Sequence, residues 1–141
     1  MILVIDLTND RLVFGAVDGR GGRWLEYPLL RGGQGALDKA LRAFGSRRRP
    51  PTAVVLVERG GPDRKMEPHV SWSTVRAGVA MANTLAYSWN VPVVGLPPDG
   101  LSSRQTLAAA AWKAAKPAKT GNWVSAAYSG EPNITKSKKT L

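Results

Sequence analysis

Short apolar blocks recur along the chain, and their spacing changes from the period of a strand to that of a helix. The first block, residues 1–6, is an apolar run that ends in a carboxylate. Two further blocks, 11–17 and 23–30, follow Asn-Asp and Asp-Gly-Arg-Gly-Gly turn sequences, and Pro28 suits an edge strand. We therefore expect an antiparallel meander of three strands.

The next apolar block has the helical period. Within residues 36–44, Leu37, Leu41 and Phe44 fall on one face together with an alanine, and a glycine follows where a helix C-cap belongs. Residues 52–58 are a continuous apolar run that again ends in a carboxylate, which predicts a buried strand.

A longer helix is expected from residue 71 or 72 to residue 89, with Ser71 or Ser73 as its cap. Its apolar seam has near-heptad spacing and consists of Trp72, Val75, Val79, Ala82, Ala86 and Trp89. A helix that is apolar around most of its circumference is either deeply buried or shared with a partner. The pattern allows both interpretations.

The remaining blocks predict a strand at 91–96, an Ala-rich helix that Ser102 or Ser103 caps and Pro117 stops, and a hairpin that begins with a strand at 122–128. This order of elements is typical of the α/β ribonuclease-H-like fold, including its actin-like branch, with a mixed sheet and helices on both faces. We expect this domain to span residues 1–117. Residues 118–141 would form a β-hairpin extension with a basic tail.

Composition narrows the function classes. The chain has 141 residues, an apolar fraction of 43%, no cysteine and a single histidine, His69. A disulfide framework, thiolate catalysis and a cysteine-bound metal are therefore excluded, and a histidine-based metal site is not expected. No apolar run has the length of a membrane span, and the N-terminus lacks the pattern of a signal peptide. We expect a soluble cytoplasmic protein without a membrane partner.

The net charge of +10 is uneven, because residues 101–141 carry seven basic residues and one acidic residue. The basic side chains either keep a small domain soluble or contact a polyanion such as tRNA or another nucleic acid. Trp123 and Tyr128 could stack on bases, or they could pack within the hairpin. The candidate phosphate contacts are Arg47, Arg48, Arg49, Lys136, Lys138 and Lys139.

Asp6 and Glu58 form the best candidate pair for chemistry, because each ends a predicted buried strand. If these strands are neighbours, both carboxylates emerge at one sheet edge, where they could hold Mg²⁺ for a nuclease, with Asp99 as a further ligand. They could equally pair with Arg59 or Arg76. The sequence Gly-Gly-Pro at 60–62 could approach a phosphate or simply connect two elements.

The chain resembles the TsaB family, a subunit of the bacterial machinery that makes threonylcarbamoyladenosine in tRNA. The opening at 2–6 matches the family's first strand, and residues 71–86 (SWSTVRAGVAMANTLA) are similar to its Ser-Phe-Thr-Gly-Leu-Arg-x-Gly-x-Ala-x-Ala-x-x-Leu-Ala sequence. Residues 90–95 and 121–128 resemble later strands of the family. From this resemblance we expect a shortened and divergent relative, since Thr74 replaces a family glycine and the sequence stops just inside the family's second domain.

The resemblance implies a non-catalytic, actin-like subunit without a cofactor of its own. Such subunits pair with the catalytic subunit TsaD through a helical bundle, and the ATPase TsaE joins them. The 72–89 seam is then an interface, and Leu37, Leu41 and Phe44 on the first helix are a second part of it.

Two rivals to this scaffold function remain. One is a small Mg²⁺-dependent nuclease of the ribonuclease-H/RuvC type, a Holliday-junction resolvase, with Asp6, Glu58 and Asp99 as catalytic residues. The other is a homodimer that uses the same helix. The small number of carboxylates favours the non-catalytic subunit, whereas the short length and Glu58 favour the nuclease, since RuvC-like enzymes also carry a Glu at the end of that strand.

Overall fold

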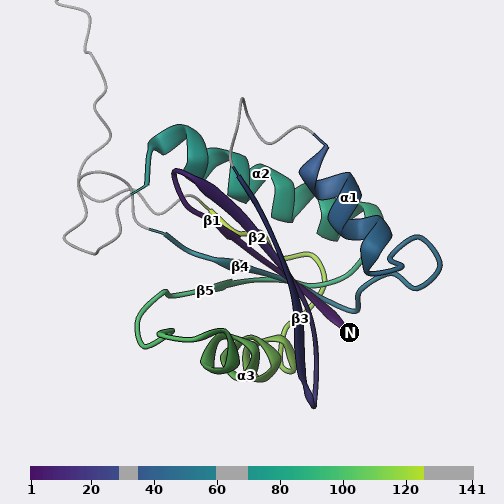
Figure 1. The fold of residues 1–141 in the computed structure, drawn as a ribbon. Helices are drawn as coiled ribbons and strands as arrows, with labels where there is room; N and C mark the ends of the chain where they lie inside the picture. Colours follow the sequence, from purple (N-terminus) through teal and green to yellow (C-terminus); the bar gives the residue numbers. More distant parts are fainter. Residues whose placement is uncertain (29–34, 60–69, 126–141) are drawn as a thin grey trace, which may run out of the picture.

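The computed structural model describes residues 1–28, 35–59 and 70–125. Its centre is a five-stranded mixed sheet with the strand order β3-β2-β1-β4-β5 (Figure 1). The elements, in chain order, are β1 (Ile2–Leu7), β2 (Arg11–Asp18), β3 (Gly21–Pro28), α1 (Ala36–Ala43), β4 (Val54–Val57), α2 (Trp72–Trp89), β5 (Val93–Leu96) and α3 (Arg104–Ala115).

The first half of the sheet is the expected antiparallel meander. All of β1 pairs with β2, and β2 and β3 pair over their full lengths. The tight turn between β2 and β3 is held by Asp18, whose Oδ1 accepts hydrogen bonds from the backbone N–H groups of Arg20 (2.8 Å) and Gly21 (3.2 Å). The strands predicted from the apolar blocks are thus confirmed.

The second half of the sheet is parallel: β1 pairs with β4, and β4 pairs with β5. Both β1 and β4 are buried at every position. This explains why their sequences are continuous apolar runs rather than alternating ones, since a parallel strand covered on both faces has no side exposed to water.

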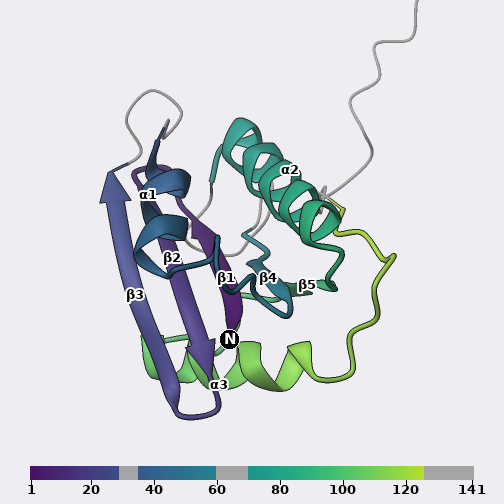
Figure 2. The same ribbon diagram turned by 90° about the vertical axis from the view of Figure 1, so that its right-hand side faces the viewer.

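Helices cover both faces of the sheet, with α1 and α2 on one face and α3 on the other (Figure 2). Alternate residues of the central strands divide between the two cores. Leu3, Ile5 and Leu7 belong to the core under α1 and α2, whereas Ile2 and Val4 belong to the core over α3. None of the helices in the described ranges is long and apolar enough to cross a membrane.

The predicted caps of the second and third helices are present. Ser71 caps α2, and its hydroxyl accepts a hydrogen bond from the N–H of Thr74. At the N-terminus of α3, Ser103 and Thr106 form a reciprocal capping box. The last helical residue of α3 is Ala115, two residues before Pro117, consistent with proline as the stop.

One expected strand is not observed in the described part of the chain. Residues 122–125, the beginning of the predicted 122–128 strand, are irregular. Here the backbone of Val124 is hydrogen-bonded by the side-chain amide of Asn83 in α2 instead of by another strand. The rest of the predicted extension, residues 126–141, lies outside the described residues.

Candidate functional site

Asp6 and Glu58 lie at the same edge of the sheet, as expected for residues at the ends of two neighbouring parallel strands. They belong to opposite faces, however. Side chains alternate between the two faces along a strand. Asp6 therefore points to the same face as Ile2 and Val4, which belong to the core over α3. Glu58 points to the same face as Leu56, which belongs to the core under α2. The two carboxylates therefore lie at one edge of the sheet but on opposite faces of it.

The partner of Asp6 is Arg59, one of the two arginines considered for this role. Arg59 donates from Nε to Oδ1 (2.9 Å) and from Nη2 to Oδ2 (2.7 Å), so both carboxylate oxygens are occupied. The two side chains are only 10% and 19% exposed. The hydrogen bonds to Asp6 raise the pKa of Arg59 above its ordinary value, against the opposing effect of partial burial.

Glu58 has a different environment. Its backbone N–H donates to the carbonyl of Leu96 (2.8 Å), which continues the β4–β5 ladder by one residue. Its side chain lies over Gly95 of β5, where a Cβ atom would overlap the carboxylate. Glu58 also lines a cavity of about 20 Å³ beneath α2, together with Val70 and Thr74.

These residues do not fit the expected Mg²⁺ pair in this arrangement. An ion on Asp6 would have to displace Arg59, and Glu58 lies on the other face. Asp99 is an exposed residue beyond β5. Among residues 1–28, 35–59 and 70–125, no group of three or more His, Cys, Asp or Glu side chains is placed to hold a metal ion.

The second candidate site is helix α2, which lies close to the sheet. It turns a stripe of every fourth residue inward: Thr74, Gly78, Ala82 and Ala86 are buried. A Cβ atom at Gly78 would come within 2.9 Å of Leu7 and 3.3 Å of Leu56. The small side chains of the stripe thus allow the close approach of helix and sheet.

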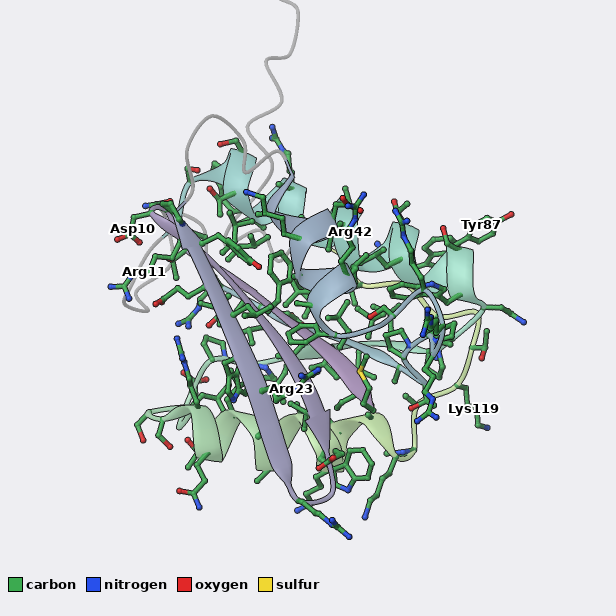
Figure 3. All side chains as sticks on the ribbon, turned by 45° about the vertical axis from the view of Figure 1, so that its right-hand side comes forward. Asp10, Arg11, Arg23, Arg42, Tyr87 and Lys119 are labelled. Carbon is green, nitrogen blue, oxygen red and sulfur yellow. The ribbon has the colours of Figure 1, made fainter. Side chains whose placement is uncertain are left out.

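This orientation corrects the expected interface. Ala82 and Ala86, two members of the predicted seam, are buried within the chain, at 0% and 4% exposure. Phe44 is buried as well, and the guanidinium of Arg23 lies 5.5 Å from the centroid of its ring; Arg23 is labelled in Figure 3. None of these three side chains is accessible to a partner, because the apolar stripe of each helix covers the chain's own sheet.

The other predicted interface residues are half-buried. Val75 and Val79 line the small cavity beneath α2. Leu37, Leu41 and Trp89 pack against the core under α1 and α2, and Trp72 lies in the first turn of α2. Because these side chains are half-buried, they can contribute only to the rim of a partner interface on the α1 and α2 side of the sheet.

The outer face of α2 was not singled out in the sequence, because most of its residues are small rather than strongly apolar. Only one of its members carries a charge. The exposed residues are Ser73, Arg76, Ala77, Ala80, Thr84, Tyr87 and Ser88. A helical wheel would predict this face only if the buried stripe were known, and the buried stripe follows from the packing of α2 on the sheet.

The predicted nucleic-acid residues are only partly described. Arg47, Arg48 and Arg49 are exposed between α1 and β4, where Arg47 lies 3.5 Å from a carboxylate oxygen of Asp38. Residues 136, 138 and 139 lie outside the described ranges, as do Tyr128, His69 and the Gly-Gly-Pro sequence at 60–62.

No protein-family model and no curated protein matches the sequence. Solved structures do match. YeaZ from Pseudomonas aeruginosa, a TsaB protein, aligns with 68% of this chain and 42% of its own, at 15% identity and a TM-score of 0.52. The chain has a ribonuclease-H-like fold.

A second solved structure, described as an uncharacterized Pseudomonas aeruginosa protein similar to peptidase YEAZ, aligns with 68% of this chain and 42% of its own. Its identity is 17% and its TM-score 0.47. RuvC from T. thermophilus, solved in complex with a Holliday junction substrate, aligns with 69% of this chain and 64% of its own, at 19% identity and a TM-score of 0.44. The predicted mixed sheet with helices on both faces is confirmed. The match with this ribonuclease-H-like chain spans less than half the length of the YeaZ chain.

Proposed function

We propose that this chain is a non-catalytic, TsaB-like subunit that binds and positions a catalytic partner through the outer face of α2. The observation that carries the proposal is the composition of that face. Helix α2 has 18 residues, and Arg76 is its only charged one. Solvent-facing helix surfaces are normally rich in charge, whereas the centres of protein interfaces are depleted in it.

The sheet edge supports a binding role rather than a chemical one. Arg59 occupies both oxygens of Asp6, and the alternation of the strands places Glu58 on the other face. The ion pair between Asp6 and Arg59 competes with a metal ion for the carboxylate, which supports the non-catalytic subunit over the Mg²⁺-dependent nuclease alternative.

The partner we propose is a TsaD-like catalytic subunit, with a TsaE-like ATPase joining the complex in the cytoplasm. This follows from the resemblance of residues 71–86 to the TsaB helix sequence. The net charge of +10 suits a complex that works on tRNA, since positive charge attracts nucleic acid regardless of its sequence. A second copy of the chain is the competing occupant of the same face.

The test is a titration of the purified chain with the TsaD-like subunit of the source organism, in which isothermal calorimetry measures the affinity. Ala77→Glu places a charge on the exposed face of α2, and we expect it to weaken binding at least about tenfold. Ala109→Glu is the matched control, because Ala109 is exposed on α3, on the other side of the sheet.

Equal affinity of the two variants would contradict the proposal. If Ala77→Glu instead abolishes a homodimer seen by light scattering and no TsaD-like subunit binds, the face is a self-association surface. Metal-dependent cleavage of branched DNA or structured RNA that Asp6→Asn abolishes would replace the scaffold by the nuclease.

A further inference from the structure

Two large aromatic side chains stand exposed beside each other at the C-terminal end of α2. Tyr87 is 77% exposed and Trp123 is 65% exposed. Their rings are nearly parallel, with an interplanar angle of 19° and 6.5 Å between centroids. Figure 3 shows Tyr87 projecting outward from the end of the helix. Among the described residues, Tyr87 and Trp123 are the large hydrophobic side chains that are exposed to solvent.

Both rings are presented by well-anchored backbone. Tyr87 lies in the last turn of α2, next to Ala86, which is buried against the sheet. Trp123 precedes Val124, whose backbone is held by Asn83 and whose side chain is buried. The platform is therefore pre-organised, which lowers the entropy cost of binding a ligand on it.

The pair borders an open groove of about 560 Å³, and none of the described residues that line it carries a carboxylate. Its polar residues are uncharged hydrogen-bonding side chains: Asn83, Ser88, Asn90, Thr120 and Asn122. Lys119 directly precedes Thr120, and Figure 3 shows it on the same edge of the molecule as Tyr87. The end of α3 and the segment that follows it, residues 113–125, carry Lys113, Lys116 and Lys119 but no Asp or Glu.

We propose that this groove binds single-stranded nucleic acid, with a base stacked on the Tyr87–Trp123 platform and the phosphate backbone directed toward Lys119. Every base has an aromatic face, so exposed rings bind unpaired bases without sequence preference. A duplex cannot use the platform in this way, because its bases are already stacked on one another. Lys119 beside the groove, and the lack of a carboxylate among the described residues that line it, favour a polyanion over a protein partner.

This site shares only Tyr87 and Ser88, at the end of α2, with the partner surface proposed above. It lies at one end of α2, and its ligand is recognised by ring stacking and positive charge rather than by a face of small residues. It also differs from the arginine loop at 47–49 predicted as a phosphate contact from the sequence.

The test measures the binding of a fluorescein-labelled oligothymidylate of about 12 nucleotides, and of its duplex with oligoadenylate, to the full chain by fluorescence anisotropy. We expect the double variant Tyr87→Ala/Trp123→Ala to bind the single strand at least about tenfold more weakly. Tyr87→Phe/Trp123→Phe keeps both rings and should bind nearly as the parent does. Lys119→Gln should reduce the salt dependence of binding by about one phosphate contact, whereas the aromatic variants should leave it unchanged.

The matched control is Gln105→Ala, an exposed change on α3 that lies outside both the groove and the outer face of α2. Circular dichroism melting shows whether each variant is folded, and both aromatic residues are exposed, so we expect little change. The proposal is overturned if the double alanine variant binds the single strand as tightly as the parent. It is also overturned if duplex and single strand lose affinity equally.

Discussion

The side-chain amide of Asn83 holds the backbone of Val124 by two hydrogen bonds. It donates from Nδ2 to the carbonyl of Val124 (2.8 Å) and accepts the N–H of the same residue at Oδ1 (3.0 Å). One amide thus satisfies both backbone groups of Val124, as a neighbouring strand would. This contact fastens the segment after α3 to α2 and places Trp123 beside Tyr87.

Asn83→Ala removes both of these hydrogen bonds and leaves the partly buried backbone groups of Val124 without a protein partner. We expect the free energy of unfolding to fall by about 1–3 kcal/mol, measured by urea denaturation. Asn83→Asp keeps an acceptor for the N–H but cannot donate to the carbonyl, so it also loses stability. If Asn83→Ala unfolds no more easily than Thr84→Ala, the contact does not stabilise the fold.

The Asp6–Arg59 pair should behave as a coupled unit. Asp6→Asn or Arg59→Met leaves the remaining charge in a mostly buried place, and we expect each to cost about 2 kcal/mol of stability. The double variant should cost less than the sum of the two. The exposed Arg11–Glu26 pair, at 3.0 Å, is the comparison, and its coupling should be close to zero. Additive effects of Asp6→Asn and Arg59→Met would show that the pair is not coupled.

The raised pKa of Arg59 fixes the sign of its pH dependence. The folded state favours the protonated guanidinium, so the stabilisation is complete below the ordinary arginine pKa and is lost only as the pH rises through the raised value. The stability difference between the parent and Arg59→Met should therefore be the same at neutral pH and at about pH 9. A difference that shrinks over this interval in denaturation experiments would contradict the assignment.

Gly15 of β2 makes room for the indole of Trp24, its cross-strand neighbour in β3. A Cβ atom at Gly15 would overlap the indole ring, so Gly15→Ala has to displace Trp24. We expect a loss of about 1–3 kcal/mol in stability and a red-shifted tryptophan emission. Gly19→Ala is the matched control. Its Cβ would meet Trp112 at an ordinary 3.6 Å, and we expect a change within about 0.5 kcal/mol.

The sequence predicts most of the elements because they depend on local patterns. The apolar runs of β1 and β4, the helical spacing of α1, and the serine caps of α2 and α3 all lie within a few residues of one another. The prediction fails at residues 122–125, where a strand-like stretch instead finds its hydrogen-bonding partner on a helix about forty residues earlier in the chain.

The candidate sites show the same division. By itself, the sequence determined the fold class, the order of the elements and the presence of two carboxylates at the ends of two strands, because each depends on local periodicity and on the parallel pairing of buried runs. Only the tertiary structure decided that Asp6 pairs with Arg59 on the face opposite Glu58, that α2 buries Ala82 and Ala86, and that Tyr87 and Trp123 meet in solvent. These outcomes depend on which face of each element packs against the sheet, and that is set by contacts between residues far apart in the chain.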